Sequence, residues 1–420
     1  MKKKLNAFSL SGLMVGPVLG SGIVVLPSLA YEALQGYAMF AWILVMLLGA
    51  GFAYVFTRMS MMVSTNEGVS RLIGEALGER FRELSANCIT VAVCFGPVAV
   101  IKTASGFIEG MLPKGVLPPI AISFLFMAVT VLLLLSGIRL MGSVTLVLST
   151  LTACVLTAGS VYSLFQNGPS ALPAGLPDMR TLGSTLLILF WAIIGWEVIG
   201  NYVEDVQDPR RTLMRAMRGS VAVVVLVYFL VTYALQSSPL IKGGTAISLD
   251  VIMIPLFGAA GPYLLGAVAL ALCYCTILMV MGAVTRQMAV RSQDGRLPAI
   301  FKQNPSGRAP VRAILALSLV HCILTILIER NVVSLAFVVS IANTFFIGNA
   351  LLGLLGAFKC MKSPWLRIVI VLLIACLASL LLFSPAVGWI MLVLVTAGTV
   401  GIAHRTNGRK VEEGRPAHEV

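Results

Sequence analysis

Long apolar runs, separated by short polar segments, fill most of the chain. Most of these runs have the ~20 residues that an α-helix needs to cross the hydrocarbon core of a bilayer. The pattern therefore predicts an all-α membrane protein with twelve membrane spans, at residues 9–31, 37–62, 84–112, 116–136, 142–166, 181–202, 214–236, 261–288, 311–328, 332–358, 366–383 and 386–403.

Three polar or mixed segments are expected to lie outside these spans. Residues 64–83 are charged and carry apolar side chains at close to helical spacing, which predicts an amphipathic helix on the cytoplasmic membrane surface. Residues 247–257 predict a short interfacial helix in an outer loop, and the tail 404–420 is expected to be cytoplasmic and disordered. Within the third span, Gly96-Pro97 predicts an interruption of the helix.

Two stretches break apolar runs with residues that do not favour a membrane helix. Residues 16–23 of span one contain three glycines, a proline and a serine, and residues 190–197 of span six contain Gly195 and Glu197. Backbone polar groups in lipid need internal partners, so such breaks are costly unless the opened backbone binds something. Paired interruptions at corresponding places of two halves point to the substrate site of a transporter.

The composition agrees with a membrane location, because 58% of the residues are apolar, 11% are charged and the mean hydropathy is +0.97. The net charge of +13 is compatible with nucleic acid binding, but its distribution indicates topology instead. All but five of the 30 Lys and Arg fall on one side of the twelve-span layout, and by the positive-inside rule both termini are cytoplasmic. The five exceptions are Lys102, Lys114, Arg180, Lys242 and Arg330.

A Pro/Gly-rich segment at 168–177 divides the spans into five before it, five after it and two more. Because five is an odd number, the second unit must be inserted upside down relative to the first, which is inverted-repeat topology. The predicted units are a first five-span repeat (1–166), a second, inverted one (178–358), two additional spans (366–403) and the tail (404–420).

Other kinds of site find little support in the sequence. Cys273 and Cys275 lack the spacing and the companions of a metal site, and no cysteine lies in a predicted outer loop where an external disulfide could form. Residues 2–30 mimic a secretory signal, but cleavage would remove the first break. Motifs of metalloproteases, serine hydrolases and phosphate-binding loops are absent, and of three histidines one, His321, lies in a span. We therefore expect no enzyme activity, no metal and no cofactor.

The two breaks suit a ligand that carries both charges on one carbon, as an α-amino acid does. The free N–H groups at the start of a half-helix can hold a carboxylate, and the free carbonyls of another half can accept from an ammonium group. Ser21, Gly22 and Ile23 would supply the N–H groups and one hydroxyl. The carbonyls of Val18, Trp191 and Ile194 would receive the ammonium.

An alternative is that Gly12, Gly16 and Gly20 form only a packing face of small residues. Their spacing fits this alternative, but packing alone does not explain Pro17, Ser21 and Gly22.

Three motifs resemble those of the amino acid–polyamine–organocation superfamily of transporters. Residues 20–23, Gly-Ser-Gly-Ile, followed by Leu26-Pro27, are similar to the motif of its first span. Gly195-Trp196-Glu197 with the charged run 204–211 and Arg215-Ala216 is similar to its sixth span and the following inner loop, and residues 291–298 resemble its loop after span eight. The resemblance covers nearly the whole chain and implies a LeuT-like inverted repeat with spans one and six broken.

The resemblance also implies roles for individual residues. Ser21 and Gly22 are expected to meet the substrate carboxylate, and Trp191 stands where family members place an aromatic gate, with a Trp packed between helices as the alternative. Glu197 is a candidate for proton coupling or for holding the break open, and a hydrogen bond to nearby backbone or to a Lys is the structural alternative. Lys102 is a second coupling candidate. Its alternative is that the side chain extends past Glu109 and places its ammonium group at the outer interface.

One position departs from the superfamily pattern. Several branches carry a Lys in span five that stands in for a sodium ion or accepts a proton, and Thr152 occupies that position here. The coupling mechanism of those branches therefore does not transfer, and sodium coupling, proton coupling and plain exchange stay open.

These observations predict a transporter of neutral, hydrophobic L-amino acids in the bacterial inner membrane. The apolar side chains around the breaks favour such a substrate, because a cationic one would want a dedicated carboxylate. The short chain and neutral pocket are most similar to bacterial exporters of methionine and branched-chain amino acids, with a proton as a candidate co-substrate and a monomer or homodimer as the assembly. The alternatives are a polyamine exchanger or cationic amino acid permease of the same fold, and a channel or nutrient sensor on that fold.

Overall fold

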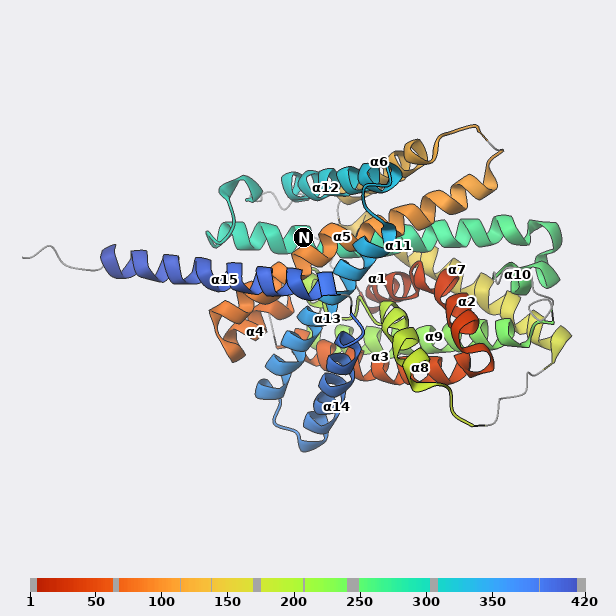
Figure 1. Ribbon diagram of the computed structural model, residues 1–420, viewed down its shortest axis with the longest axis horizontal. Helices are drawn as coiled ribbons and strands as arrows, with labels where there is room; N and C mark the ends of the chain where they lie inside the picture. Colours follow the sequence, from red (N-terminus) through yellow and green to blue (C-terminus); the bar gives the residue numbers. More distant parts are fainter. Residues whose placement is uncertain are drawn as a thin grey trace, which may run out of the picture.

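The computed structural model describes residues 6–62, 68–113, 115–136, 138–168, 175–206, 208–239, 249–302, 309–384 and 386–413. Helices make up these segments (Figure 1). The α-helices are α1 (Ala7–Leu19), α2 (Gly22–Leu34), α3 (Ala38–Ser60), α4 (Val69–Leu77), α5 (Glu79–Met111), α6 (Pro119–Leu135), α7 (Ile138–Asn167), α8 (Met179–Leu189), α9 (Pro209–Ser237), α10 (Asp250–Phe257), α11 (Gly261–Gln293), α12 (Val311–Glu329), α13 (Leu335–Cys360), α14 (Pro364–Leu381) and α15 (Ala386–Glu413). The 3-10 helices are η1 (Gln35–Tyr37), η2 (Phe190–Ala192), η3 (Glu197–Asp205), η5 (Gly258–Ala260) and η6 (Ala299–Phe301).

Every predicted membrane span corresponds to helical structure in the described part of the chain. There, 8 helical stretches are long and apolar enough to cross a membrane, and shorter apolar helices cover Pro119–Leu135, Met179–Ala192 and Ala386–Thr399. The stretch Ala7–Ser60 includes spans one and two, and Asp250–Gln293 includes α10 and span eight. The chain is an all-helical, multi-pass membrane protein, whereas its division into two five-span repeats stays a prediction.

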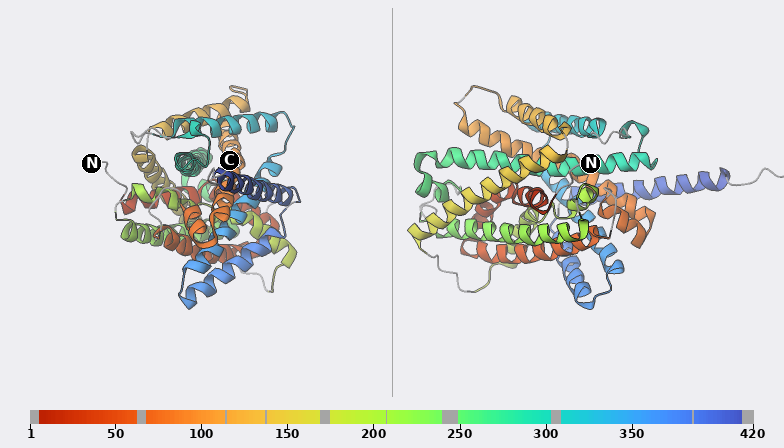
Figure 2. Two further views of the ribbon diagram at one scale, coloured as in Figure 1. Left: turned by 90° about the vertical axis from the view of Figure 1, so that its left-hand side faces the viewer. Right: turned by 180° about the vertical axis from the view of Figure 1, so that it is seen from behind.

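The first half of span one lies in the middle of the helix bundle. Helix α1 packs against α7, α9 and α11, and every residue from Gly12 to Leu19 is buried. Helices α6 and α12 run along one side of the molecule, and α3, α8 and α14 lie on the opposite side (Figures 1 and 2). The first half of span one is thus enclosed by other helices.

Ion pairs gather at one end of the bundle, on the left in Figure 1 near α4. Arg291 of α11, 3% exposed, donates to the Oε2 of Glu83 at 2.6 Å and to the Oδ1 of Asn87 at 2.8 Å, both on α5. The chain then turns at Gly295, which has φ 74°, and the Arg296 N–H donates to the Arg291 carbonyl at 2.8 Å. We call this side the basic end, and the side that carries α10 the far end.

The interruption predicted in the third span at Gly96-Pro97 is wrong, because α5 is continuous through both residues. Proline has no N–H, so Pro97 cannot donate to the carbonyl four residues earlier, at Val93. His321 of α12 takes that place: its Nε2 lies 2.7 Å from the Val93 oxygen. The buried histidine of span nine therefore satisfies the carbonyl that the proline leaves free.

Two further boundaries differ from the prediction. Residues 68–83 do not form one amphipathic helix, because Gly78, with φ 105°, separates α4 from α5; the predicted start of that helix, 64–67, lies outside the described residues. The buried face of α4 packs against α5 and α13. The prediction of disorder from His404 onward is wrong for residues 404–413, because α15 continues to Glu413. Several residues of this segment have high helix propensity. Helix α10 confirms the predicted short helix from Asp250 to Phe257.

Candidate substrate site at two helix breaks

Span one is broken between α1 and α2, inside the predicted stretch. Helix α1 ends at Leu19, Gly20 has φ 46° and ψ −161°, and α2 begins at Gly22. A Cβ at Gly20 would lie 2.5 Å from the Pro17 oxygen and 2.6 Å from the Oγ1 of Thr276 in α11. Glycine is required here both by the backbone angle and by the close approach of α11.

Span six is broken over the predicted residues as well. Helix α8 ends at Leu189, a short turn of 3-10 helix follows, and η3 starts at Glu197. Gly195 has φ 121°, a conformation that side chains with a Cβ rarely adopt. The Oε2 of Glu197, whose residue is 5% exposed, accepts from the Gly195 N–H at 3.1 Å. Glu197 therefore accepts a hydrogen bond from the opened backbone, as a structural role of this residue requires.

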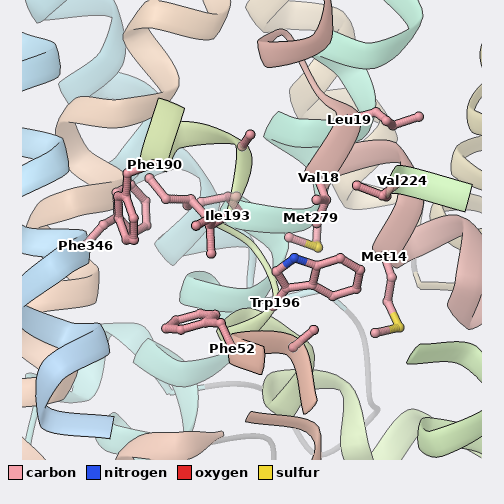
Figure 3. Close-up of a cluster of buried hydrophobic side chains, with 14 of the residues drawn as sticks. Met14, Val18, Leu19, Phe52, Phe190, Ile193, Trp196, Val224, Met279 and Phe346 are labelled. Carbon is pink, nitrogen blue, oxygen red and sulfur yellow. The ribbon is translucent and has the colours of Figure 1, made fainter. Parts of the chain in front are cut away.

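The two breaks lie against each other. A Cβ at Gly195 would lie 3.4 Å from Cγ2 of Val18 in α1 and 3.2 Å from Cε of Met279 in α11. The apolar side chains of the second break, Ile193 and Trp196, are buried in the surrounding core, where Trp196 lies below Met279 (Figure 3). These anchors fix the irregular backbone beside α1.

Tyr228 of α9 is a site residue that the sequence analysis missed. Its hydroxyl lies 3.3 Å from the Val18 oxygen and 3.2 Å from the Leu19 oxygen, the carbonyls that the end of α1 leaves free. The ring stacks on Trp42 of α3 with a centroid distance of 4.4 Å, and Tyr228 is fully buried. Each carbonyl oxygen has a second lone pair, so the contact leaves room for another donor. A tyrosine in an apolar run gave no signal of this role.

A small cavity of about 20 Å³ adjoins the breaks. This volume admits about one water molecule, so the structure is closed around the site. The side chains and backbone that line it come from spans one, three, six, eight and ten, and none of them is charged: Pro17, Gly96, Pro97, Val100, Trp191, Ile194, Thr276, Ile277, Met279, Val280 and Phe346.

The predicted site residues fall into two groups. Trp191 and Ile194 line the cavity, and Val18, Ser21, Gly22, Ile23 and Gly195 lie in the adjoining breaks without lining it. The lining from spans three, eight and ten was not predicted: most of these residues are apolar ones within apolar runs, and Gly96-Pro97 was interpreted only as a helix interruption.

Trp191, which follows α8 in the second break, lines the cavity and contacts several neighbouring elements. Its indole meets the ring of Phe346 edge to face, with a centroid distance of 6.4 Å and an interplanar angle of 89°. A Cβ at Gly22 would lie 3.4 Å from Trp191 Cδ1, and one at Gly96 would lie 3.6 Å from its Cη2. The indole thus extends from α2 to α5, and a Cβ at either glycine would be in van der Waals contact with it.

A second closure lies on the basic side of the breaks. The Tyr202 hydroxyl of η3 donates to the Met279 carbonyl of α11 at 2.7 Å, and the Arg286 guanidinium lies over the Tyr202 ring at 5.1 Å from its centroid. The Nε of Arg286 also lies 3.8 Å from Oδ2 of Asp205. These contacts hold the second half of span six against span eight.

Two of the predicted coupling candidates lie away from this cavity. Lys102 of α5 forms an ion pair of 2.7 Å with Glu329 at the end of α12, a partner that the sequence analysis did not anticipate, while Glu109 is exposed. Thr152 is buried in α7, 1% exposed. The close approach of α7 to the first break comes from Thr145, whose Cγ2 would lie 3.1 Å from a Cβ at Gly16.

An all-helical membrane bundle with two broken spans that lie against each other is the architecture of a secondary transporter. The fold is similar to that of a Na⁺-coupled sialic acid symporter in a substrate-bound, outward-open state, with a TM-score of 0.63, 10% identity, and coverage of 92% of this chain and 90% of that one.

The particular family follows from the sequence. Residues 5–401 match the amino acid permease family, and the chain belongs to it. It is therefore an amino acid transporter of the amino acid–polyamine–organocation class and not an enzyme.

Two relatives illustrate the range of this family. The chain is 22% identical over 395 residues to the L-methionine/branched-chain amino acid exporter YjeH of Escherichia coli (strain K12), covering 93% of each chain. It is 26% identical over 341 residues to the cadaverine/lysine antiporter of the same organism, covering 78% of this chain and 75% of that one.

Proposed function

We propose that this permease exports a neutral, hydrophobic L-amino acid of the methionine and branched-chain class across the bacterial cytoplasmic membrane by alternating access. The observation that carries the proposal is the cavity at the helix breaks, whose lining includes Trp191, Ile194, Met279 and Phe346 and no charged side chain. An apolar substrate side chain gains by leaving water for such a lining, whereas a charged one would lose hydration without a partner. The similarity to the methionine and branched-chain exporter over 93% of both chains supports the same class.

The two breaks account for the charged part of the substrate. The first N–H groups of a helix have no intrahelical partner, so those of Ser21, Gly22 and Ile23 at the start of α2 can bind the substrate carboxylate. The Ser21 side chain does not cap α2, which leaves its hydroxyl for the same carboxylate. The ammonium group would bind carbonyls at Val18 and, across the break, at Ile194.

The closed cavity implies movement during the transport cycle. A volume of about 20 Å³ does not hold an amino acid, so the site must widen before substrate enters. Separation of Trp191 from Phe346 would open it toward the far end, and separation of Tyr202 from Met279 would open it toward the basic end. A bundle of spans one, two, six and seven would move against a scaffold of spans three, four, five, eight, nine and ten, with both termini cytoplasmic.

A second candidate is exchange of cationic amino acids or polyamines. The 26% identity to a cadaverine/lysine antiporter favours it. Against it stands Glu197, the carboxylate of the second break, because its oxygen already accepts from the Gly195 N–H. A cationic side chain would compete with that hydrogen bond.

The test is a thermal-shift screen of the purified protein against the twenty amino acids and cadaverine. A ligand that binds the folded state raises its apparent melting point by mass action, by ~2.7 kcal/mol of stability at 100 times its Kd. We expect stabilisation by methionine, leucine and isoleucine, and counterflow of radiolabelled leucine in proteoliposomes. Stabilisation by lysine and cadaverine instead would establish the second candidate, and no stabilisation or counterflow by any of them would overturn both.

A further inference from the structure

A wide groove lies between α3 and α9, on a face of the bundle separate from the substrate cavity. Its volume is about 720 Å³, and only these two helices line it. Along α9 it extends from Met217 to Tyr233, which at ~1.5 Å per residue is about 24 Å. This length exceeds half of the ~30 Å hydrocarbon core, so the groove can hold an acyl chain of one leaflet along its full length.

The charge of the groove is confined to its basic end. Arg218 is its one charged lining residue, and Arg215 precedes it on the same face of α9. On α3, Arg58 follows the lining residue Tyr54 by one helical turn and extends the same face. All three arginines are exposed, and none of them forms an ion pair with a residue that the structure describes.

The rest of the groove lining is mainly apolar and includes small residues on both helices. Ala222 lies one turn beyond Arg218, is exposed and leaves space where a larger side chain would fill the groove. Phe229 and Tyr233 form its walls toward the middle and the far end. A cationic mouth continuous with an apolar channel matches an anionic headgroup joined to an acyl chain.

We propose that the groove between α3 and α9 binds an anionic phospholipid, with its phosphate on Arg215 and Arg218 and one acyl chain along Ala222 and Phe229. Basic pockets between membrane helices bind anionic headgroups, and the guanidinium group presents paired N–H donors that match a phosphate. A second copy of this chain is a poorer occupant. A two-fold axis along the membrane normal would place the arginines of both copies opposite one another at the same depth. The inference does not depend on which substrate the permease carries.

The test compares lipid retention by native mass spectrometry, using phosphatidylglycerol and phosphatidylcholine with identical acyl chains as probes. The wild-type protein should retain phosphatidylglycerol in preference to phosphatidylcholine. The double variant Arg215→Gln/Arg218→Gln should bind phosphatidylglycerol about 25-fold more weakly, since each arginine near the membrane surface contributes about fivefold. The matched control is Arg80→Gln/Arg312→Gln, which removes two exposed arginines from α5 and α12, outside the groove. It should bind the lipid like the wild-type protein.

A second variant tests the apolar part without changing charge. Ala222→Trp should fill the groove and displace the lipid, while Val147→Trp, at an exposed position of α7, should leave binding unchanged. If both double arginine variants weaken binding equally, the attraction is general and the site is refuted. Retention of phosphatidylglycerol by Ala222→Trp at the wild-type level would refute it too, even if the arginine variant fails to fold.

Discussion

The hydrogen bond between Glu197 and the Gly195 N–H allows a structural role of the glutamate to be separated from a role in proton coupling. Glu197→Ala leaves a buried N–H of the second break without its acceptor. Because a buried donor left without a partner costs about 1–3 kcal/mol, the variant should lose about 2 kcal/mol of stability. Glu197→Gln retains an oxygen acceptor of the same reach and should lose less than about 1 kcal/mol.

The assay is thermal unfolding of both variants in the same detergent, followed by tryptophan fluorescence. A loss of 1 kcal/mol lowers the midpoint by about 2–4 °C in a chain of 150–250 residues and by less in a longer one, so the alanine variant should melt a few degrees lower. An alanine variant as stable as the wild-type protein would refute the capping role. Counterflow at several pH values then tests coupling. If Glu197 only caps the break, the glutamine variant keeps the pH profile of the wild-type protein. A flattened pH profile would assign Glu197 a role in proton transfer.

Three further outcomes are expected. Gly20→Ala should lower stability by about 1–3 kcal/mol in the same unfolding assay, because φ is 46° and the added Cβ meets the Pro17 oxygen. The control is Gly219→Ala, where a Cβ meets nothing within 4 Å, and this variant should be neutral or slightly stabilising. Ser21→Trp should fill the carboxylate niche and abolish counterflow and ligand-induced thermal stabilisation; unchanged binding would show that the substrate lies elsewhere. Arg286→Gln removes the ion pair between α11 and η3. Cysteines introduced near the breaks should then react faster with a thiol reagent added from the basic end than the same cysteines do with Arg286 present. Equal reaction rates would exclude a closure there.

The span pattern and both breaks could be predicted from the sequence, because each is a local property. A run of apolar residues either is or is not long enough to cross a bilayer, and Gly20 and Gly195 both have positive φ, which glycine adopts readily. The same logic failed at Gly96-Pro97, where a helix that looks broken is continuous. His321, more than two hundred residues further along the chain, supplies the missing donor. No local pattern records such a partner.

The lining of the cavity was also beyond local reasoning. Tyr228 and Phe346 belong to apolar runs in which neighbouring positions are equally suitable for a site, and only packing determines which of them faces the breaks. The same holds for Lys102, whose partner Glu329 lies at the end of a distant helix.

The sequence by itself determined that this protein is a multi-span helical bundle, where its first and sixth predicted spans break and to which transporter class it is similar. Hydrophobic length, glycine and proline act over a few residues, so their consequences are visible in the chain itself. The tertiary structure alone decided that the breaks lie against each other, that Glu197 and Tyr228 satisfy the opened backbone, and that Trp191 and Phe346 meet in the lining of the cavity. Those contacts join residues far apart in sequence, and they depend on how the helices pack rather than on what each helix contains.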